Sequence, residues 1–125
     1  MQLFLAAAAG GALGAGARYL VNVTCMQLLG PSFPWATMTV NIVGSFLMGV
    51  IVAASGTLLS GSAVLRTFLA TGILGGFTTF SAFSLDVFEL FERRQPALAA
   101  LYIAASLGIS VAALVAGVAL VRSLR

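Results

Sequence analysis

The stretch "GGFTTFSAFS", residues 75–84, decides the fold because it interrupts an otherwise apolar chain. It pairs two glycines with two threonines, and then sets two phenylalanines three positions apart with a serine after each. Glycine and threonine are weak helix formers. The stretch therefore predicts a membrane helix that breaks at mid-membrane depth. The backbone groups freed there must face protein, water or an ion, because lipid cannot pair with them.

The composition is that of an integral membrane protein. Of 125 residues, 61% are hydrophobic and 7% are charged, and the mean hydropathy is +1.13. A soluble domain carries about 25% charged residues, so a water-facing surface cannot be built from this chain and its partner is the lipid bilayer. No basic stripe is visible in the sequence, so we expect no nucleic-acid binding.

Four segments are long enough to cross a bilayer, which takes about 20 apolar residues. They span residues 2–29, 33–55, 63–91 and 95–121. The connections are short, so neighbouring helices must be antiparallel, and the whole chain is expected to form one all-α transmembrane domain. The first segment lacks a basic leading region and is expected to be a membrane helix rather than a cleavable signal peptide.

Small residues recur every four positions on two of these helices. Ala6, Gly10 and Gly14 do so on the first, and Ser45 and Gly49 on the second. Such faces allow close approach of helix backbones in lipid. Two interpretations are open: packing within one chain, or a seam between two copies.

The arginines are balanced between the two ends of the predicted bundle. One end has Arg18, Arg93 and Arg94, and the other has Arg66, Arg122 and Arg125. An excess of positive charge normally fixes the orientation of a membrane protein. With no excess, the sequence predicts insertion both ways round and an antiparallel, dual-topology homodimer. The alternative is one orientation fixed by other features.

Two polar side chains interrupt the first two spans, and such residues often have a function. Arg18 either extends its guanidinium to the headgroups or faces an aqueous vestibule. Asn41 has Thr37 and Ser45 one helical turn to either side, so these three side chains share a face. The asparagine is either a donor for a ligand or a link between helices.

Hydroxyls and aromatic rings mark the last two spans. Tyr102, Ser106 and Ser110 form one stripe on the fourth helix, which indicates a polar lane, although serine can also bond its own helix. Phe80 and Phe83 are either lipid-facing or packed side chains, or rings whose positive edges line an anion path.

The sequence excludes several classes of enzyme. It has no histidine and one cysteine, so a zinc cluster, a Ser-His-Asp triad and a Cys-His pair cannot form within one chain. A small multidrug-resistance-type transporter of dual topology is the alternative function. It needs a carboxylate in the first helix, and the three acids all lie toward the far end of the third segment. A non-transporting scaffold would leave the hydroxyl stripe unexplained.

Three motifs carry a family resemblance: "GGFTTFSAFSLD", "NIVGSFLMG" and "GGALGAGARY". Together they resemble the fluoride channel family (Fluc, also called CrcB) over essentially the whole chain. The resemblance implies a four-helix subunit of a dual-topology homodimer. It also implies a fluoride-selective channel in the inner (plasma) membrane, which passively exports fluoride from the cytoplasm and relieves its toxicity.

The resemblance also assigns roles to residues. The fluoride pore would comprise Asn41, Thr79, Phe80, Ser81, Phe83, Tyr102, Ser106 and Ser110. Arg18 would lie in the vestibule. The backbone carbonyls of Gly75 and Thr78 would hold a central, structural sodium ion at the dimer axis.

Overall fold

The computed structural model describes residues 1–57 and 59–125, and this part of the chain contains helices and connecting turns without strands. Three spans are single helices: α1 (Gln2–Leu29), α2 (Trp35–Ala54) and α6 (Pro96–Ser123). The third span is composed of α3 (Ala63–Arg66), the π-helix η1 (Thr67–Leu74), α4 (Gly75–Phe77) and α5 (Phe80–Glu92).

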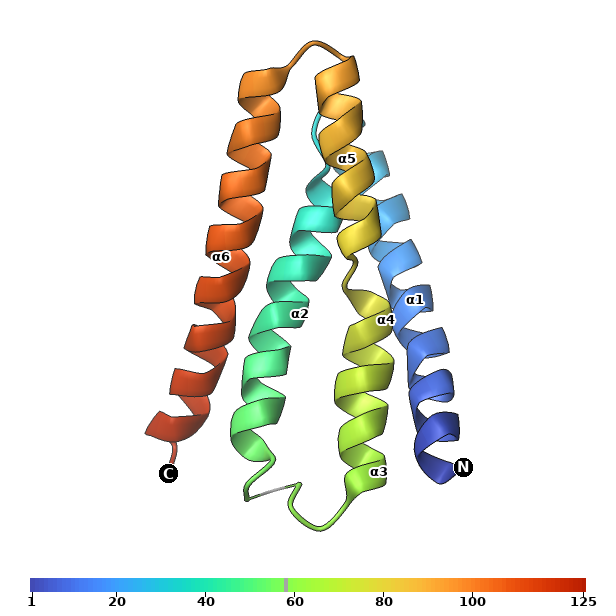
Figure 1. Cartoon of the computed structure of the whole chain (residues 1–125), viewed down its shortest axis with the longest axis vertical. Helices are drawn as coiled ribbons and strands as arrows, with labels where there is room; N and C mark the ends of the chain where they lie inside the picture. Colours follow the sequence, from blue (N-terminus) through green and yellow to red (C-terminus); the bar gives the residue numbers. More distant parts are fainter. Residues whose placement is uncertain (58) are drawn as a thin grey trace.

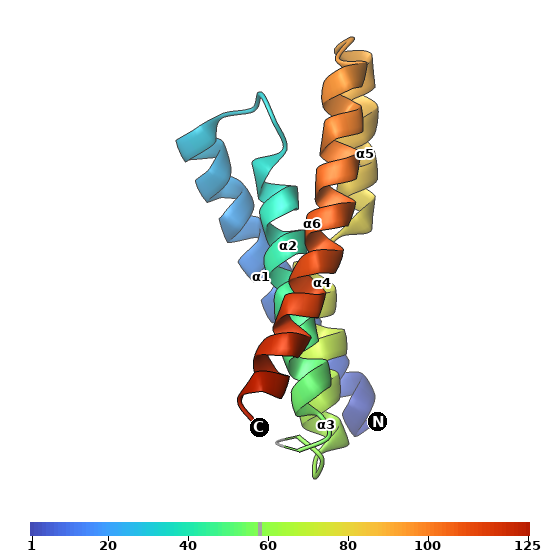
Figure 2. The ribbon, with the colours of Figure 1, turned by 90° about the vertical axis from the view of Figure 1, so that its left-hand side faces the viewer.

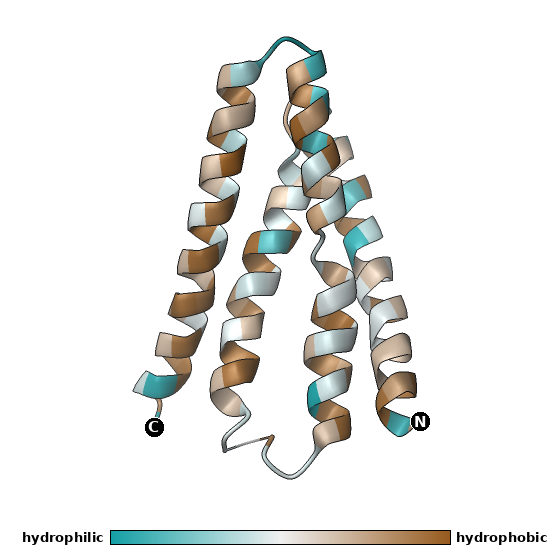
Figure 3. Cartoon of the chain, in the orientation of Figure 1, coloured by the Kyte–Doolittle hydropathy of each residue, from teal (hydrophilic) through white to brown (hydrophobic). Residues whose placement is uncertain are grey.

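Four helices in the described residues are long and apolar enough to cross a membrane. They run alternately up and down, so that both termini lie at the same end (Figure 1). Hydrophobic residues cover most of each helix, whereas the turn between α5 and α6 is hydrophilic (Figure 3). The expected all-α membrane fold with four spans is confirmed.

The third span is broken, as predicted, but the break is narrower than the sequence indicates. Only Thr78 and Thr79 leave the helix, with φ/ψ of −79°/160° and −156°/122°. Gly75 and Gly76 remain helical in α4. Figure 1 shows the break as a short extended link between α4 and α5. α5 restarts at Phe80, because the Thr79 hydroxyl caps it by accepting a hydrogen bond from the Ala82 N–H at 3.1 Å.

Glycines of α1 and of the third span instead allow these two helices to approach closely. A Cβ at Gly10 would collide with the Phe68 carbonyl, one at Gly14 with the Ile73 carbonyl, and one at Gly76 with the backbone of α1. Backbones can approach this closely only where side chains are absent. The small-residue face of α1 is therefore an intrachain packing surface, which decides between the two interpretations for this helix.

A second glycine contact joins α2 and α6, which run in the same direction (Figure 1). A Cβ at Gly49 would collide with the Leu114 carbonyl, and one at Gly117 with the Phe46 carbonyl. These two contacts fix how far α6 is shifted along α2.

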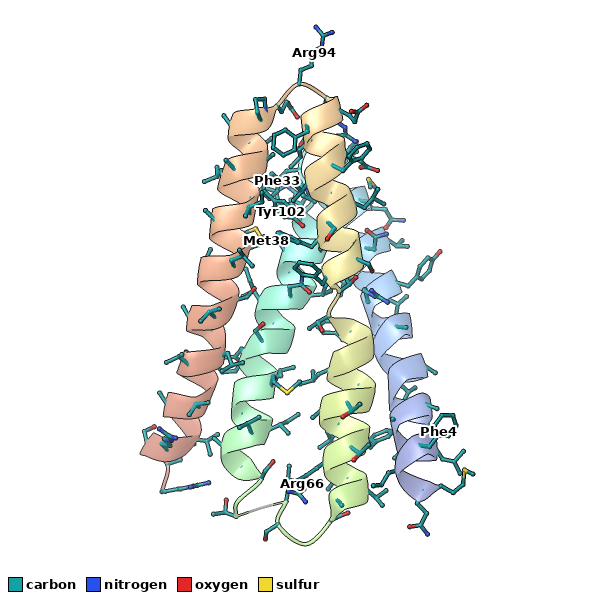
Figure 4. All side chains as sticks on the ribbon, viewed as in Figure 1. Phe4, Phe33, Met38, Arg66, Arg94 and Tyr102 are labelled. Atoms are coloured by element: carbon teal, nitrogen blue, oxygen red, sulfur yellow. The ribbon has the colours of Figure 1, made fainter. Side chains whose placement is uncertain are left out.

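At the opposite end of the molecule the helices spread apart (Figure 2). There α5 and α6 stay together, while α1 and the turn after it lean away. Phe83, Leu90, Ala99 and Tyr102 form a buried cluster between α5 and α6. Phe33 and Met38 pack against it, and Figure 4 shows both beside Tyr102. The spread leaves room for cavities beside the break.

Candidate functional site

The break is held by a side chain from the neighbouring helix α2. The Asn41 Nδ2 donates to the Thr79 carbonyl at 3.0 Å, and the Thr79 N–H donates to the Asn41 Oδ1 at 2.8 Å. Thr79 is 8% exposed. These two bonds fix the orientation of the amide and pair both backbone groups of Thr79. One amide N–H of Asn41 is left over, since asparagine has two donor hydrogens.

The break leaves backbone carbonyls without intrahelical donors, as the end of any helix does, and those of Gly75 and Thr78 are among them. In a continuous helix the N–H of Thr79 would donate to Gly75, and that of Ala82 to Thr78. Here the Thr79 N–H donates to Asn41, and the Ala82 N–H donates to the Thr79 hydroxyl. The carbonyls of Gly75 and Thr78 therefore lose their helical donors. Hard cations bind carbonyl oxygens, so this pair fits the sodium-ligand assignment.

A cavity of about 300 Å³ lies between α2, α5 and α6, beside the break. It brings together many of the residues that the sequence singled out. Its polar and aromatic lining comprises Asn41, Ser45, Thr78, Thr79, Phe80, Phe83, Ser106 and Ser110. The sequence places these residues on three separate spans, and the break gathers them around one space.

Two hydroxyls in this cavity wall have no partner. The Oγ atoms of Ser106 and Ser110 are buried and form no hydrogen bond with any residue that the structure describes. Leaving a buried donor unpaired costs about 1–3 kcal/mol. An acceptor that entered the cavity would remove this cost. The third hydroxyl of the stripe, that of Tyr102, has a partner described below.

The two phenylalanines have different surroundings. Their ring centroids are 5.5 Å apart with 37° between the planes. Phe83 is 7% exposed and its ring lies 5.2 Å from that of Tyr102, whereas Phe80 is 73% exposed on the single chain. Ser81 is also exposed, and its hydroxyl lies 3.3 Å from that of Thr79. Phe83 is thus a buried ring in the wall of the cavity, and Phe80 projects from the surface of the subunit.

Asp86 is part of the site, although sequence reasoning grouped it with the acids at the far end of the third span. The Tyr102 hydroxyl donates to the Asp86 Oδ2 at 2.9 Å. Its spacing could have revealed it, because Asp86 follows Phe83 by three residues and so shares its helix face. The sequence also gave Thr37 no role, yet Thr37 lines a cavity together with Asp86.

This second cavity measures about 390 Å³ and contains Arg18. Arg18, Asn22, Thr37, Thr79 and Asp86 contribute its polar lining. Arg18 therefore lines a cavity, and its assignment to a vestibule stays a prediction. Thr79 lines this cavity as well as the first one. The break therefore lies between a cavity lined by Arg18 and a cavity lined by the unpaired hydroxyls.

The family described as "CrcB-like protein, Camphor Resistance (CrcB)" matches residues 5–118 of this sequence. The chain belongs to the CrcB-like family. This CrcB-like chain is 57% identical over 117 residues to a protein of Agrobacterium fabrum named "Fluoride-specific ion channel FluC", with 94% of each chain covered. Two other proteins of that name are similar. One from Cereibacter sphaeroides is 58% identical over 118 residues, covering 94% of this chain and 93% of the relative. One from Rhodospirillum centenum is 54% identical over 123 residues, covering 98% of each.

These relatives confirm the family resemblance drawn from the three motifs. They are named as ion channels, so the CrcB-like chain is not an enzyme, as expected. Together with the four apolar spans they make it a multi-pass membrane protein. The assignment of individual residues to a fluoride pore, and of Gly75 and Thr78 to a sodium site, stays a prediction.

Proposed function

We propose that this chain is a fluoride-selective channel that lets fluoride leave the cytoplasm down its gradient. The observation that supports it most directly is the cavity beside the break. There the clamped Asn41 amide, two phenylalanine rings and the unpaired hydroxyls of Ser106 and Ser110 line one space. The relatives named as fluoride-specific ion channels support the same function.

The chemistry of this lining suits a small anion. Fluoride is strongly hydrated, so a selective path must replace its water with closely spaced donors. The remaining amide N–H of Asn41 and the hydroxyls of Ser106 and Ser110 supply them. Neither arginine nor lysine lines this cavity. Binding can then be weak enough for the ion to leave, as conduction requires.

The functional unit that we propose is a homodimer of oppositely oriented subunits in the plasma membrane. The arginine balance of three against three removes the usual bias toward one orientation. On the single chain, Phe80 and Gly75 are exposed beside the break. A second copy would cover this face and complete the walls of the pathway.

A sodium ion held by the Gly75 and Thr78 carbonyls would lie at the centre of this dimer. Two copies would each contribute both oxygens, and oxygen-only ligation suits a hard cation. The ion would add positive charge and link the subunits. We expect the purified dimer to unfold at a lower temperature when sodium is replaced by N-methylglucamine. An identical unfolding temperature in both buffers would contradict a structural sodium ion.

The function is tested by measuring ion efflux from liposomes. Purified protein is reconstituted into vesicles loaded with potassium fluoride or potassium chloride, and an ion-selective electrode follows release after valinomycin is added. We expect rapid loss of fluoride and retention of chloride. Equal rates for the two anions would overturn the proposal. Uptake of tetraphenylphosphonium driven by a pH gradient would instead favour a multidrug-type transporter, although α1 has no carboxylate.

A further inference from the structure

The helix α2 carries polar side chains at the same four-residue interval as α6. The proposed pore uses Asn41 from α2 and the hydroxyl stripe of α6, and leaves two residues of α2 without a role. The two series are Thr37, Asn41 and Ser45 on α2, and Tyr102, Ser106 and Ser110 on α6. Both series lie on one face of their helix, because residues four apart are neighbours on a helix surface.

The glycine contact between α2 and α6 places the two series of polar residues at the same height along the helices. α2 and α6 run in the same direction, and Gly49 meets the carbonyl of Leu114. One helical turn back from this contact on each helix lie Ser45 and Ser110. Ser45 is therefore at the same height as Ser110, and both line the cavity beside the break.

An anion that binds at the Ser110 hydroxyl needs a second hydrogen-bond donor nearby. Its Oγ is buried and has no partner among the residues described. A serine hydroxyl donates one hydrogen bond only. A fluoride ion that has lost its water would remain poorly paired with one donor. Ser45, on the facing wall, is placed to supply the other.

We propose that Ser45 is a further fluoride-binding residue, paired with Ser110 at the end of the groove where Gly49 and Leu114 bring the helices together. The proposal rests on the channel function proposed above and adds a donor on α2 to it. Because the two helices approach closely at this contact, the pair of hydroxyls would select for a small anion. The aliphatic side chains of Met48 and Leu114 line the same cavity and offer no hydrogen bond of comparable strength.

The experiment compares Ser45→Ala with Ser45→Thr in the full-length protein in liposomes. Fluoride efflux is measured over a range of fluoride concentrations. We expect Ser45→Ala to raise the half-saturating concentration roughly tenfold, because one hydrogen bond to a charged group is lost. Ser45→Thr retains the hydroxyl and should stay close to wild type. Thr39→Val is the matched control, since it removes a hydroxyl from an exposed position of α2 that lines neither of the two cavities beside the break.

The outcomes separate this inference from the proposed function. If the wild-type protein does not release fluoride, the channel proposal itself fails. If the wild type conducts and Ser45→Ala shows the same concentration dependence, only the Ser45 inference is overturned.

Ser45→Cys serves as a near-isosteric second variant with a weak donor, so a folding defect in Ser45→Ala cannot decide the result. A merely structural role predicts that loss of Ser45 and loss of Ser110 act independently. The double variant should instead depart from the product of the two single effects, because two donors to one ion are energetically coupled.

Discussion

The two halves of the third span differ in what their unusual residues do. In the lower half, from Thr67 to Phe77, Gly72 and Gly76 allow the helix to pack closely against the backbone of α1. In the upper half, from Phe80 to Glu92, the helix packs on α6 and leaves cavities on its other sides. Residues 75–84 therefore combine two separate effects, close helix packing and a break in the helix. Glycine here provides close packing, and the Asn41–Thr79 pair provides the break.

The largest effect is expected in the packed half. Gly14→Ala should prevent correct folding, because its Cβ would meet the backbone carbonyl of Ile73, which has no flexible end to move aside. Overpacking of this kind costs about 1–3 kcal/mol or more. The yield of monodisperse protein and its thermal unfolding measure the effect. Gly11→Ala is the control, since a Cβ there meets nothing within 4 Å.

In the open half the expected effect falls on transport rather than on folding. Phe80→Ile and Phe83→Ile should each lower fluoride efflux by at least about tenfold, because an aliphatic side chain lacks the positive ring edge. Size-exclusion elution of the variants should match the wild type. Unchanged efflux in both variants would remove the phenylalanines from the pore.

Loss of the two Asn41–Thr79 hydrogen bonds, which lie between the two halves, should have an intermediate effect. Asn41→Ala removes both bonds to Thr79 and leaves its backbone groups unpaired, at a cost of roughly 1–3 kcal/mol. We expect faster hydrogen exchange at the Thr79 amide, together with reduced fluoride efflux. Normal exchange protection at this amide would show that Asn41 does not hold the break.

The smallest effect on the fold is expected at Gly75. A Cβ there meets only the Ala70 carbonyl, at 3.8 Å, so Gly75→Ala should be tolerated by the single chain, with a change of less than about 1 kcal/mol. Helix content measured by circular dichroism should not change. In the proposed dimer this position faces the second copy, so the fraction of dimer in detergent should fall. A variant that remains as dimeric as the wild type would place Gly75 away from the seam.

Much of the fold could be predicted because it depends on composition and spacing. The four spans follow from hydropathy, and the stripe of Tyr102, Ser106 and Ser110 follows from helical periodicity. The π-helix η1 could not be predicted, since its wider turns have no residue signature. The width of the break could not be predicted either, because Gly75 and Gly76 are weak helix formers and yet both remain helical. Of the two, Gly76 is the one with the backbone of α1 packed against it.

The candidate site was harder to predict wherever it depends on contacts between spans. Asn41 and Thr79 are 38 positions apart, and only the packing of α2 on the third span brings them together. The same holds for Asp86, whose bond to Tyr102 crosses from α5 to α6. In the sequence, Asp86 is grouped with the acids toward the end of the third span. In the structure it accepts a hydrogen bond from Tyr102 and lines the second cavity.

The double hydrogen bond of Asn41 has a thermodynamic consequence. One amide group accepts from the Thr79 N–H, which leaves the Gly75 carbonyl without its helical donor, and the same amide lines the cavity beside the break. In the proposed channel that carbonyl would bind sodium and the remaining amide N–H would bind fluoride. Any shift of that amide toward an anion would change the strength of the bonds that keep the carbonyl free. Linkage requires such an influence to act equally in both directions. Sodium would then change the affinity for fluoride by the same factor by which fluoride changes the affinity for sodium.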